Sequence, residues 1–511
     1  MTVVDEPIEA PVLDGAGDTE VEHFDVLIVG AGLSGVGAAR RLEAECPWAD
    51  YAIFEARGAM GGTWDLFRYP GIRSDSDMFT LGYSFKPWRG QKAISDGASI
   101  LAYIEATARE AGIDRKIRYN RRVISAEWSS EDARWTVTVE HVDTGETSTV
   151  TADFYYACSG YYRYDHGHTP DFEGASDFRG RIVHPQHWPE DLDYSDKRVM
   201  VIGSGATAIT LVPAMTDKAA KVTMLQRSPT YVVSLPATNP LANLLHKVLP
   251  ERVAAPMVRW SLAVGTQGLY HLSKWRPNLV RKILLRRVAR QLPAGYDVAT
   301  HFTPKYDPWD ERLCAVTDGD LFKAIKAGKA EVVTDRIVRF TETGIELESG
   351  GEVPADIIVT ATGLDLLFLG GIDLVVDGEK VDVSERLAYK GMMLEGVPNL
   401  AMAVGYTNSS WTLKADLTSE YTARLLNHMR TIGMRQCTPV NSDPSVQAQP
   451  LLGLASGYIT RSQGDFPKQG SKFPWQVHQS YLRDYRSMHN RPVDQDAMAF
   501  SNPATRRTKV A

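Results

Sequence analysis

Three glycines and an acid near the N-terminus have the spacing of a dinucleotide site. Gly30, Gly32 and Gly35 form a Gly-x-Gly-x-x-Gly pattern, and Glu55 follows twenty residues after the last of them. The first glycine allows a tight turn, the second lets the backbone approach a pyrophosphate, and the third lets a helix pack closely on a strand. The N-terminus of that helix faces the phosphates, and Glu55 can accept a hydrogen bond from a ribose hydroxyl. The pattern predicts a dinucleotide, in preference to a plain strand–helix–strand core unit, without choosing between FAD and NAD.

A second unit of the same kind lies further along the chain. It reads Gly203-x-Gly205-x-x-Ala208, and Arg227 stands nineteen residues past Ala208. An acid at that place suits a bare ribose, whereas an arginine suits a ribose 2′-phosphate, so this site should prefer NADPH. A solvated surface role for Arg227 is the alternative, and Ser228 beside it favours the phosphate role by adding a hydroxyl donor. If the first unit holds a flavin, a flavin site and a nicotinamide site in one chain imply hydride transfer between them.

Apolar segments around both patterns predict the strands that position these residues. The expected buried strands are residues 26–29, 51–54, 154–157, 198–202, 221–225 and 357–360. Alternating apolar and polar residues predict antiparallel meanders over 121–153 and 331–349. We therefore expect an α/β fold with two Rossmann-like dinucleotide-binding domains, one for FAD and one for NADPH.

The order of these segments predicts the domain boundaries. The chain should leave the FAD-binding domain near residue 165 and return after Gly363, so that domain comprises 23–165 and 364–511. The NADPH-binding domain comprises 166–363 and carries a helical insertion over 236–300. Residues 1–22 hold seven acids and no lysine or arginine, and we expect them to form a disordered acidic tail.

The basic character of the insertion leaves two interpretations. An apolar stripe is surrounded by basic residues; the stripe is Val280, Ile283, Leu284, Val288 and Leu292, and the basic residues are Arg281, Lys282, Arg286, Arg287 and Arg290. Such a helix could lie on an acidic membrane surface or on a partner. A helix packed on the core with a solvated basic rim is the interpretation we favour, so peripheral membrane contact stays an alternative.

Composition excludes several classes of protein. The 511 residues carry a net charge of −7, which argues against nucleic-acid binding. The four cysteines are far apart, so we expect no metal site and a reducing, cytoplasmic setting. A pyridine nucleotide–disulfide reductase needs paired redox cysteines beside its flavin, and only Cys46 is near. No uncharged apolar segment reaches eighteen residues, so no transmembrane helix is expected.

Two longer patterns resemble the fingerprints of Baeyer–Villiger monooxygenases. One is Phe178-x-Gly180-x-x-x-His184-x-x-x-Trp188-Pro189-Glu190. The other is Gly61-Gly62-x-Trp64-x-x-x-x-Tyr69-Pro70-Gly71-x-x-x-Asp75. Both matches are complete, and the resemblance runs from about Asp25 to Leu482. Taken singly, Trp188 would be a core residue and His184 a linker histidine.

The resemblance implies an activity and a charged centre. NADPH would reduce FAD, oxygen would give a flavin peroxide, and its anion would attack a ketone to yield an ester. A buried anion needs a fixed positive group, and the matching residue is Arg312, with Asp75 as the acid that orients it. A surface ion pair is the alternative role for Arg312. Many family members carry a basic residue where this chain has Glu311, which puts the local NADPH contact in doubt.

The resemblance also implies the binding residues. For FAD they are Gly30, Gly32, Ser34, Gly35, Glu55, Gly62, Thr63, Trp64, Asp75 and Val123. For NADPH they are Arg73, Ser74, Gly203, Ser204, Gly205, Ala206, Thr207, Ala208, Arg227 and Ser228. Asn408 and Trp411 are expected to line the substrate pocket, although packing is nearly as favoured for Trp411.

The implied substrates are small molecules together with dioxygen. Ketones would give esters, and thioethers or thioamides, including prodrugs of the ethionamide type, would undergo S-oxygenation. An N- or S-oxygenating flavin monooxygenase without Baeyer–Villiger activity is the first alternative. A non-catalytic redox sensor that binds both dinucleotides is the second.

Overall fold

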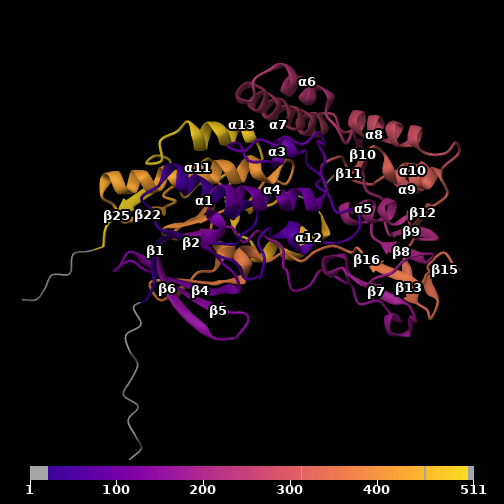
Figure 1. The fold of residues 1–511 in the computed structure, drawn as a ribbon, viewed down its shortest axis with the longest axis horizontal. Coiled ribbons are helices and arrows are strands. Elements are labelled where there is room, and N and C mark those ends of the chain that lie inside the picture. The colour runs from indigo at the N-terminus through magenta and orange to yellow at the C-terminus, as the bar shows by residue number, and fades with distance from the viewer. Residues whose placement is uncertain (1–20, 312, 454–455, 504–511) are drawn as a thin grey trace, which may run out of the picture.

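The computed structural model describes residues 21–311, 313–453 and 456–503, and a mixed sheet and a parallel sheet lie side by side in it (Figure 1). The first sheet has nine strands in the order β18-β17-β4-β5-β6-β1-β2-β3, with β21 paired to β6. Its strands are β1 (His23–Val29), β2 (Tyr51–Phe54), β3 (Ile117–Arg118), β4 (Arg121–Ser129), β5 (Arg134–His141), β6 (Thr147–Ala157), β17 (Asp373–Val376), β18 (Glu379–Lys380) and β21 (Leu400–Met402). The sheet thus combines the N-terminal part of the chain with the part after residue 363.

Strand β1 is covered on both faces. Val26 and Ile28 belong to one buried cluster, and Leu27 and Val29 belong to another. Successive side chains of a strand point to opposite faces, so a doubly covered strand reads as an unbroken apolar run. Helix α1 (Leu33–Glu45) packs against α11 (Trp411–Ile432) and α4 (Gly97–Glu110) on one of these faces.

Strand β6 joins the predicted meander to the parallel part of the first sheet. Residues 147–152 pair antiparallel with β5, and residues 151–157 pair parallel with β1. The meander predicted over 121–153 and the strand predicted over 154–157 are therefore both present. Strand β6 is continuous and forms the last strand of the meander and the whole of the predicted strand over 154–157.

The second sheet is all parallel, in the order β12-β9-β8-β16-β7. Its strands are β7 (Arg181–Val183), β8 (Arg198–Ile202), β9 (Lys221–Gln226), β12 (Ala330–Thr334) and β16 (Ile357–Thr360). Helices α5 (Ala206–Met215) and α10 (Asp320–Lys326) precede β9 and β12. The fold is thus α/β with two dinucleotide-type sheets, as the sequence predicted.

The predicted meander over 331–349 was wrong in its first strand. Strand β12 pairs parallel with β9, because α10 and a reversal at Gly328 return the chain to the sheet as a crossover. The antiparallel meander is formed by β13 (Ile337–Phe340), β14 (Gly344–Leu347) and β15 (Glu352–Pro354).

The insertion contains three consecutive helices that pack on neighbouring helices and on a short strand. They are α6 (Pro240–Val248), α7 (Glu251–Trp275) and α8 (Pro277–Gln291). Helix α7 packs on α3 (Met78–Leu81) and α13 (Tyr481–Asp484), whereas α8 packs on β10 (Val232–Leu235) and α10. In the described part of the chain, no helix has both the length and the apolar character needed to cross a membrane.

Shorter elements complete the fold. They are α2 (Thr63–Leu66), α9 (Val298–Phe302), α12 (Gly457–Ser462), β11 (Cys314–Thr317), β19 (Ala388–Tyr389), β20 (Met393–Leu394), β22 (Gln436–Pro439), β23 (Ala448–Pro450), β24 (Lys468–Gly470) and β25 (Met498–Ser501).

Candidate dinucleotide and oxygenation site

The first glycine turn brings β1 and α1 into close contact. Gly30 has φ +104°, and a Cβ there would lie 2.6 Å from the carbonyl oxygen of Cys158. A Cβ on Gly35 would lie only 1.9 Å from the carbonyl oxygen of Gly30. Gly32 begins α1 without any side-chain cap, so the first-turn N–H groups supply the donors that a pyrophosphate needs.

Glu55 lies at this turn, as the spacing predicted. Its carboxylate accepts hydrogen bonds from the N–H of Ala31 at 2.8 Å and from the N–H of Arg57 at 3.0 Å. Burial raises the pKa of Glu55, and the two backbone hydrogen bonds oppose that shift. Each carboxylate oxygen has a further lone pair that can accept a ribose hydroxyl.

The segment after Glu55 folds back over the first turn. The N–H of Gly61 donates to the carbonyl oxygen of Ala31 at 3.0 Å, and Gly62 has φ +56°. A Cβ on Gly32 would lie 3.6 Å from the Cα of Gly62. Thr63 and Trp64 begin α2 directly after this contact, so Gly62, Thr63 and Trp64 lie together beside the glycine turn.

The same segment then crosses to the second unit. Tyr69 is buried in the core of the second sheet and shares a side-chain hydrogen bond with Thr207. Gly71 has φ +79°, and a Cβ there would lie 2.6 Å from the Cβ of Ala214 on α5. Burial raises the pKa of Tyr69, and the charge of Asp75 adds to that shift. Residues 61–75 therefore connect the two glycine turns.

Arg73 and Ser74 lie at this crossing in contact with protein groups. The Arg73 guanidinium pairs with Asp320 of α10 at 2.5 Å, and 15% of the Arg73 side chain is exposed. The hydroxyl of Ser74 is buried and accepts a hydrogen bond from the N–H of Ser76. To contact NADPH, the Arg73 guanidinium would have to leave Asp320 or bind the nucleotide while it keeps this ion pair.

The second glycine turn has the same backbone arrangement as the first, with more free space around its second glycine. Gly203 has φ +134°, and a Cβ there would lie 2.3 Å from the carbonyl oxygen of Ala361. Gly205 begins α5 without a side-chain cap, and a Cβ on it would meet nothing within 4 Å. Ala206 and Thr207 form the first turn of α5, and Ala208 is fully buried. Because Ala208 keeps a methyl group, α5 packs less closely on its turn than α1 does.

Arg227 and Ser228 lie at the edge of the second turn. Ser204 donates a hydrogen bond from its hydroxyl to the carbonyl oxygen of Ser228 at 3.0 Å, and both Arg227 and Ser228 are exposed. Burial raises the pKa of Glu311, and the positive charge of Arg227 opposes that shift. The structure therefore brings the acid at 311 into the electric field of the predicted phosphate-binding arginine.

The fingerprint around His184 holds the two linkers between the sheets. His184 Nε2 lies 3.2 Å from the carbonyl oxygen of Gly363 on the returning linker. A Cβ on Gly167 of the outgoing linker would lie 2.0 Å from His184 Cε1. Gln186 donates from its side chain to the carbonyl oxygen of Arg163 at 2.7 Å. Burial lowers the pKa of His184, so its imidazole is kept neutral.

The predicted substrate residues lie at the start of α11 and on the loop before it. Trp411 donates from its indole nitrogen to the Ser34 hydroxyl at 2.8 Å, and its ring contacts Tyr161 at a centroid distance of 5.0 Å. Asn408 is buried and donates to the carbonyl oxygen of Gln479 at 3.0 Å. The start of α11 therefore lies against the N-terminus of α1.

The remaining predicted residues are Val123, Arg312 and Asp75. Val123 is buried within β4 and pairs with Val139, and its side chain belongs to the core. Arg312 lies outside the described residues. Asp75 lies on the crossing segment near Tyr69.

The sequence analysis missed Tyr164 and Gln479. Tyr164 lies 3.5 Å from the Thr63 hydroxyl, and its hydroxyl would lie 3.3 Å from a Cβ on Gly62. Burial raises the pKa of Tyr164 to about 12. Ligands of α/β sheets bind at the carboxyl ends of the strands, so the aromatic run that follows β6 was the available signal. Gln479 is distant in sequence from the loop it supports and gave no signal.

Comparison with known proteins extends over nearly the whole chain. A family model described as flavin-binding monooxygenase-like matches residues 93–432, and one described as an NAD(P)-binding Rossmann-like domain matches residues 28–88. The FAD-containing monooxygenase EthA of Mycobacterium tuberculosis is 54% identical over 481 residues, covering 94% of this chain and 98% of that protein. The putative FAD-containing monooxygenase MymA of the same organism is 52% identical over 488 residues, covering 94% and 98%.

A solved structure supports the fold independently. The structure described as an oxidized steroid monooxygenase bound to NADP matches with a TM-score of 0.74 at 23% identity. The match covers 94% of this chain and all of that one.

Proposed function

Because this chain belongs to the flavin-binding monooxygenase-like family, we propose that it binds FAD and NADPH, oxidises ketones to esters and oxygenates the sulfur of thioethers and thioamides. The observation that carries the proposal is the segment 61–75, which contacts the turns of both units. Its first residues pack on Gly32, and Tyr69 and Gly71 pack on α5. Two dinucleotides held at turns joined in this way suit a transfer of hydride from one to the other.

The residues at the first turn fit a flavin dinucleotide. The uncapped first turn of α1 supplies N–H donors for the pyrophosphate, and Glu55 supplies a buried acceptor for the ribose. When bound, FAD accepts hydride from NADPH and activates dioxygen. Gly62, Thr63 and Trp64 would close over the cofactor and exclude water from it.

The residues at the second turn fit a phosphorylated nicotinamide dinucleotide. The uncapped start of α5 and the open space above Gly205 leave room for a pyrophosphate. Arg227 and Ser228 are exposed at the end of β9, and we propose that they bind the 2′-phosphate.

Arg312 is proposed as the fixed cation of the oxygenation centre. A guanidinium stays protonated at any working pH, so it stabilises negative charge that develops on oxygen during the reaction. Asp75 is proposed to orient it, and Asn408 and Trp411 are proposed to line the substrate pocket.

Four buried cysteines without disulfides support a cytoplasmic setting.

The deciding experiment compares two substrates with the purified protein. We expect a visible flavin absorption spectrum, faster consumption of NADPH than of NADH, and both an ester from a ketone and a sulfoxide from a thioether by product mass. Sulfoxide without ester would instead identify an N- or S-oxygenating enzyme. Tight binding of both dinucleotides without substrate-stimulated NADPH consumption would identify a redox sensor.

A further inference from the structure

Exposed apolar side chains are concentrated on the three helices of the insertion. Among the described residues, eleven of the nineteen exposed large apolar side chains lie on α6, α7 and α8. Trp275, at the end of α7, is 72% exposed. Figure 1 shows these helices along one edge of the molecule. Single exposed apolar residues are ordinary on a protein surface, whereas a contiguous group marks an interaction site.

The outward face of α7 is uncharged between residues 253 and 273. Val253, Met257, Val264, Leu272 and Trp275 are exposed and recur at the spacing of one helical face. Between residues 253 and 273 the only lysine, arginine, aspartate or glutamate is Arg259, and its side chain is buried. An exposed helix in water normally carries charged residues on its outer face, so this face is suited to contact with an apolar medium.

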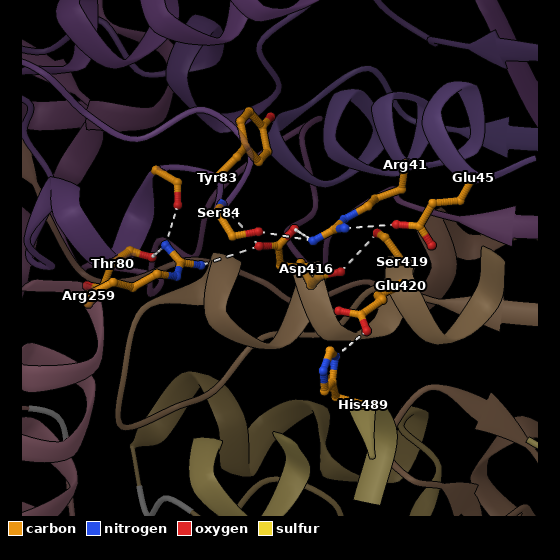
Figure 2. Close-up of polar contacts among 12 residues, drawn as sticks. Arg41, Glu45, Thr80, Tyr83, Ser84, Arg259, Asp416, Ser419, Glu420 and His489 are labelled. Carbon is orange, nitrogen blue, oxygen red and sulfur yellow. Dashed lines mark hydrogen bonds and ion pairs between the residues drawn. The ribbon is translucent and has the colours of Figure 1, made fainter. Parts of the chain in front are cut away.

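The inner face of α7 makes polar contacts that hold this face against the rest of the protein. Arg259 donates to the carbonyl oxygens of Phe79, Thr80 and Gly82 at 3.2, 3.1 and 2.6 Å. Figure 2 shows its guanidinium directed at Asp416 of α11, at 3.5 Å. Further along, Gln267 accepts a hydrogen bond from the N–H of Tyr481 at 3.0 Å.

Positive charge surrounds the apolar face. Residues 240–291 contain ten lysines and arginines and a single acid, Glu251, although the chain as a whole has a net charge of −7. Lys282, Arg286 and Arg287 are exposed on α8. A hollow of about 400 Å³ on this helix is lined in part by Arg281, Lys282 and Arg286. The surface is therefore apolar along α7 and cationic along α8.

We propose that α6, α7 and α8 dock the protein on the surface of an anionic lipid bilayer. Exposed tryptophan and aliphatic side chains would enter the interface, and the arginines and lysines would contact acidic headgroups. A symmetric contact between two copies would place two cationic surfaces against each other, which disfavours it. Nucleic acid would satisfy the positive charge and leave the apolar face of α7 in water. The proposal is independent of the chemistry proposed above.

Flotation of the full-length, FAD-loaded protein with lipid vesicles tests this. We expect binding to phosphatidylcholine vesicles that contain phosphatidylglycerol, weak binding to phosphatidylcholine alone, and release by salt. Arg286→Gln and Arg287→Gln should each weaken binding roughly fivefold. Leu272→Ser with Trp275→Ser should abolish it. All four side chains are exposed, so melting temperature and flavin content should not change.

Matched substitutions elsewhere supply the control. Val338 is 46% exposed on β13, and Lys380 is exposed on β18. Val338→Ser and Lys380→Gln should therefore leave vesicle binding unchanged. Equal binding to neutral and anionic vesicles, or none to either, would overturn the proposal. Size-exclusion chromatography that shows a dimer dissociated by Trp275→Ser would overturn it in favour of a contact between copies.

Discussion

His184 Nε2 lies 3.2 Å from the carbonyl oxygen of Gly363, so the fingerprint histidine contacts the segment by which the chain returns to its first sheet. The N–H of His168, on the outgoing linker, donates to the same carbonyl at 3.1 Å. Both linkers between the sheets thus meet at one point. The pattern from Phe178 to Glu190 contains no glycine turn of its own, and its position gives it another role, because it contacts both linkers between the two units.

Replacement of His184 should weaken this junction. His184→Gln is expected to lower the free energy of unfolding by about 1–2 kcal/mol, because hydrogen bonds to Gly363 and Gln186 are lost or lengthened. Urea unfolding measures this. His187→Gln is the control, since His187 is exposed and its ring nitrogen bonds the carbonyl oxygen of Asp165. A larger loss for His187→Gln than for His184→Gln would contradict the assignment.

The same histidine should make stability depend on pH. Burial lowers the pKa of His184 below its ordinary value of 6.5, so the unfolded chain takes up a proton at a higher pH than the folded one. Its contribution to stability is therefore complete above about 6.5 and is lost as the pH falls towards the folded-state pKa. Urea unfolding between pH 7.5 and 5.5, roughly one unit either side of that value, should show a steeper loss for the wild type than for His184→Gln. Identical slopes would exclude this role.

The two glycine turns give a matched pair of substitutions. A methyl group on Gly35 would lie 1.9 Å from the carbonyl oxygen of Gly30, whereas Ala208 already carries a methyl group at the equivalent place. Gly35→Ala should cost about 3 kcal/mol or more and prevent flavin incorporation. Ala208→Gly should cost about 1–2 kcal/mol and leave flavin content unchanged. Flavin-to-protein absorbance ratios and thermal melting measure both, and a flavin-loaded Gly35→Ala protein would refute the close-packing argument.

Removal of the proposed cation should separate reduction from oxygenation. Arg312→Ala is expected to abolish ester formation while some NADPH oxidation survives, because the positive charge is needed where negative charge develops on oxygen. Product mass and NADPH absorbance measure the two steps separately. Arg276→Ala, which removes an exposed arginine of the insertion, should change neither. An unchanged ester yield in the Arg312→Ala variant would refute the role.

Local patterns predicted the fold, whereas contacts between distant residues were not predictable. The glycine spacings and apolar runs lie within about thirty residues of sequence, so they identified both units and most strands. Strand β12 was wrongly assigned to a meander, because its alternating apolar and polar residues fit both a meander strand and the edge strand of a parallel sheet. Arg73 meets Asp320 across 247 positions, and Trp411 meets Ser34 across 377. No local pattern encodes such pairs, so Arg73 was expected to contact NADPH and its ion pair with Asp320 was not predicted.

The position of Glu311 near Arg227 gives a prediction about nucleotide affinity. The charge of Arg227 acts on the Glu311 carboxyl, so that carboxylate should repel the 2′-phosphate that we propose Arg227 binds. Glu311→Gln keeps the size of the side chain and removes the charge. It should lower the KM for NADPH about three- to tenfold and leave the KM for NADH unchanged, because NADH has no 2′-phosphate.

Arg227→Ala is the reciprocal change. It should raise the KM for NADPH at least about tenfold with little effect on NADH, since a charge-assisted contact to phosphate is lost. Steady-state kinetics with both nucleotides measure the two variants side by side. In the double variant, Glu311→Gln should no longer improve NADPH binding, because the group through which it acts is absent. If Glu311→Gln lowered the KM for NADPH equally with and without Arg227, the acid would act on the nucleotide directly and the coupling between the two residues would be refuted.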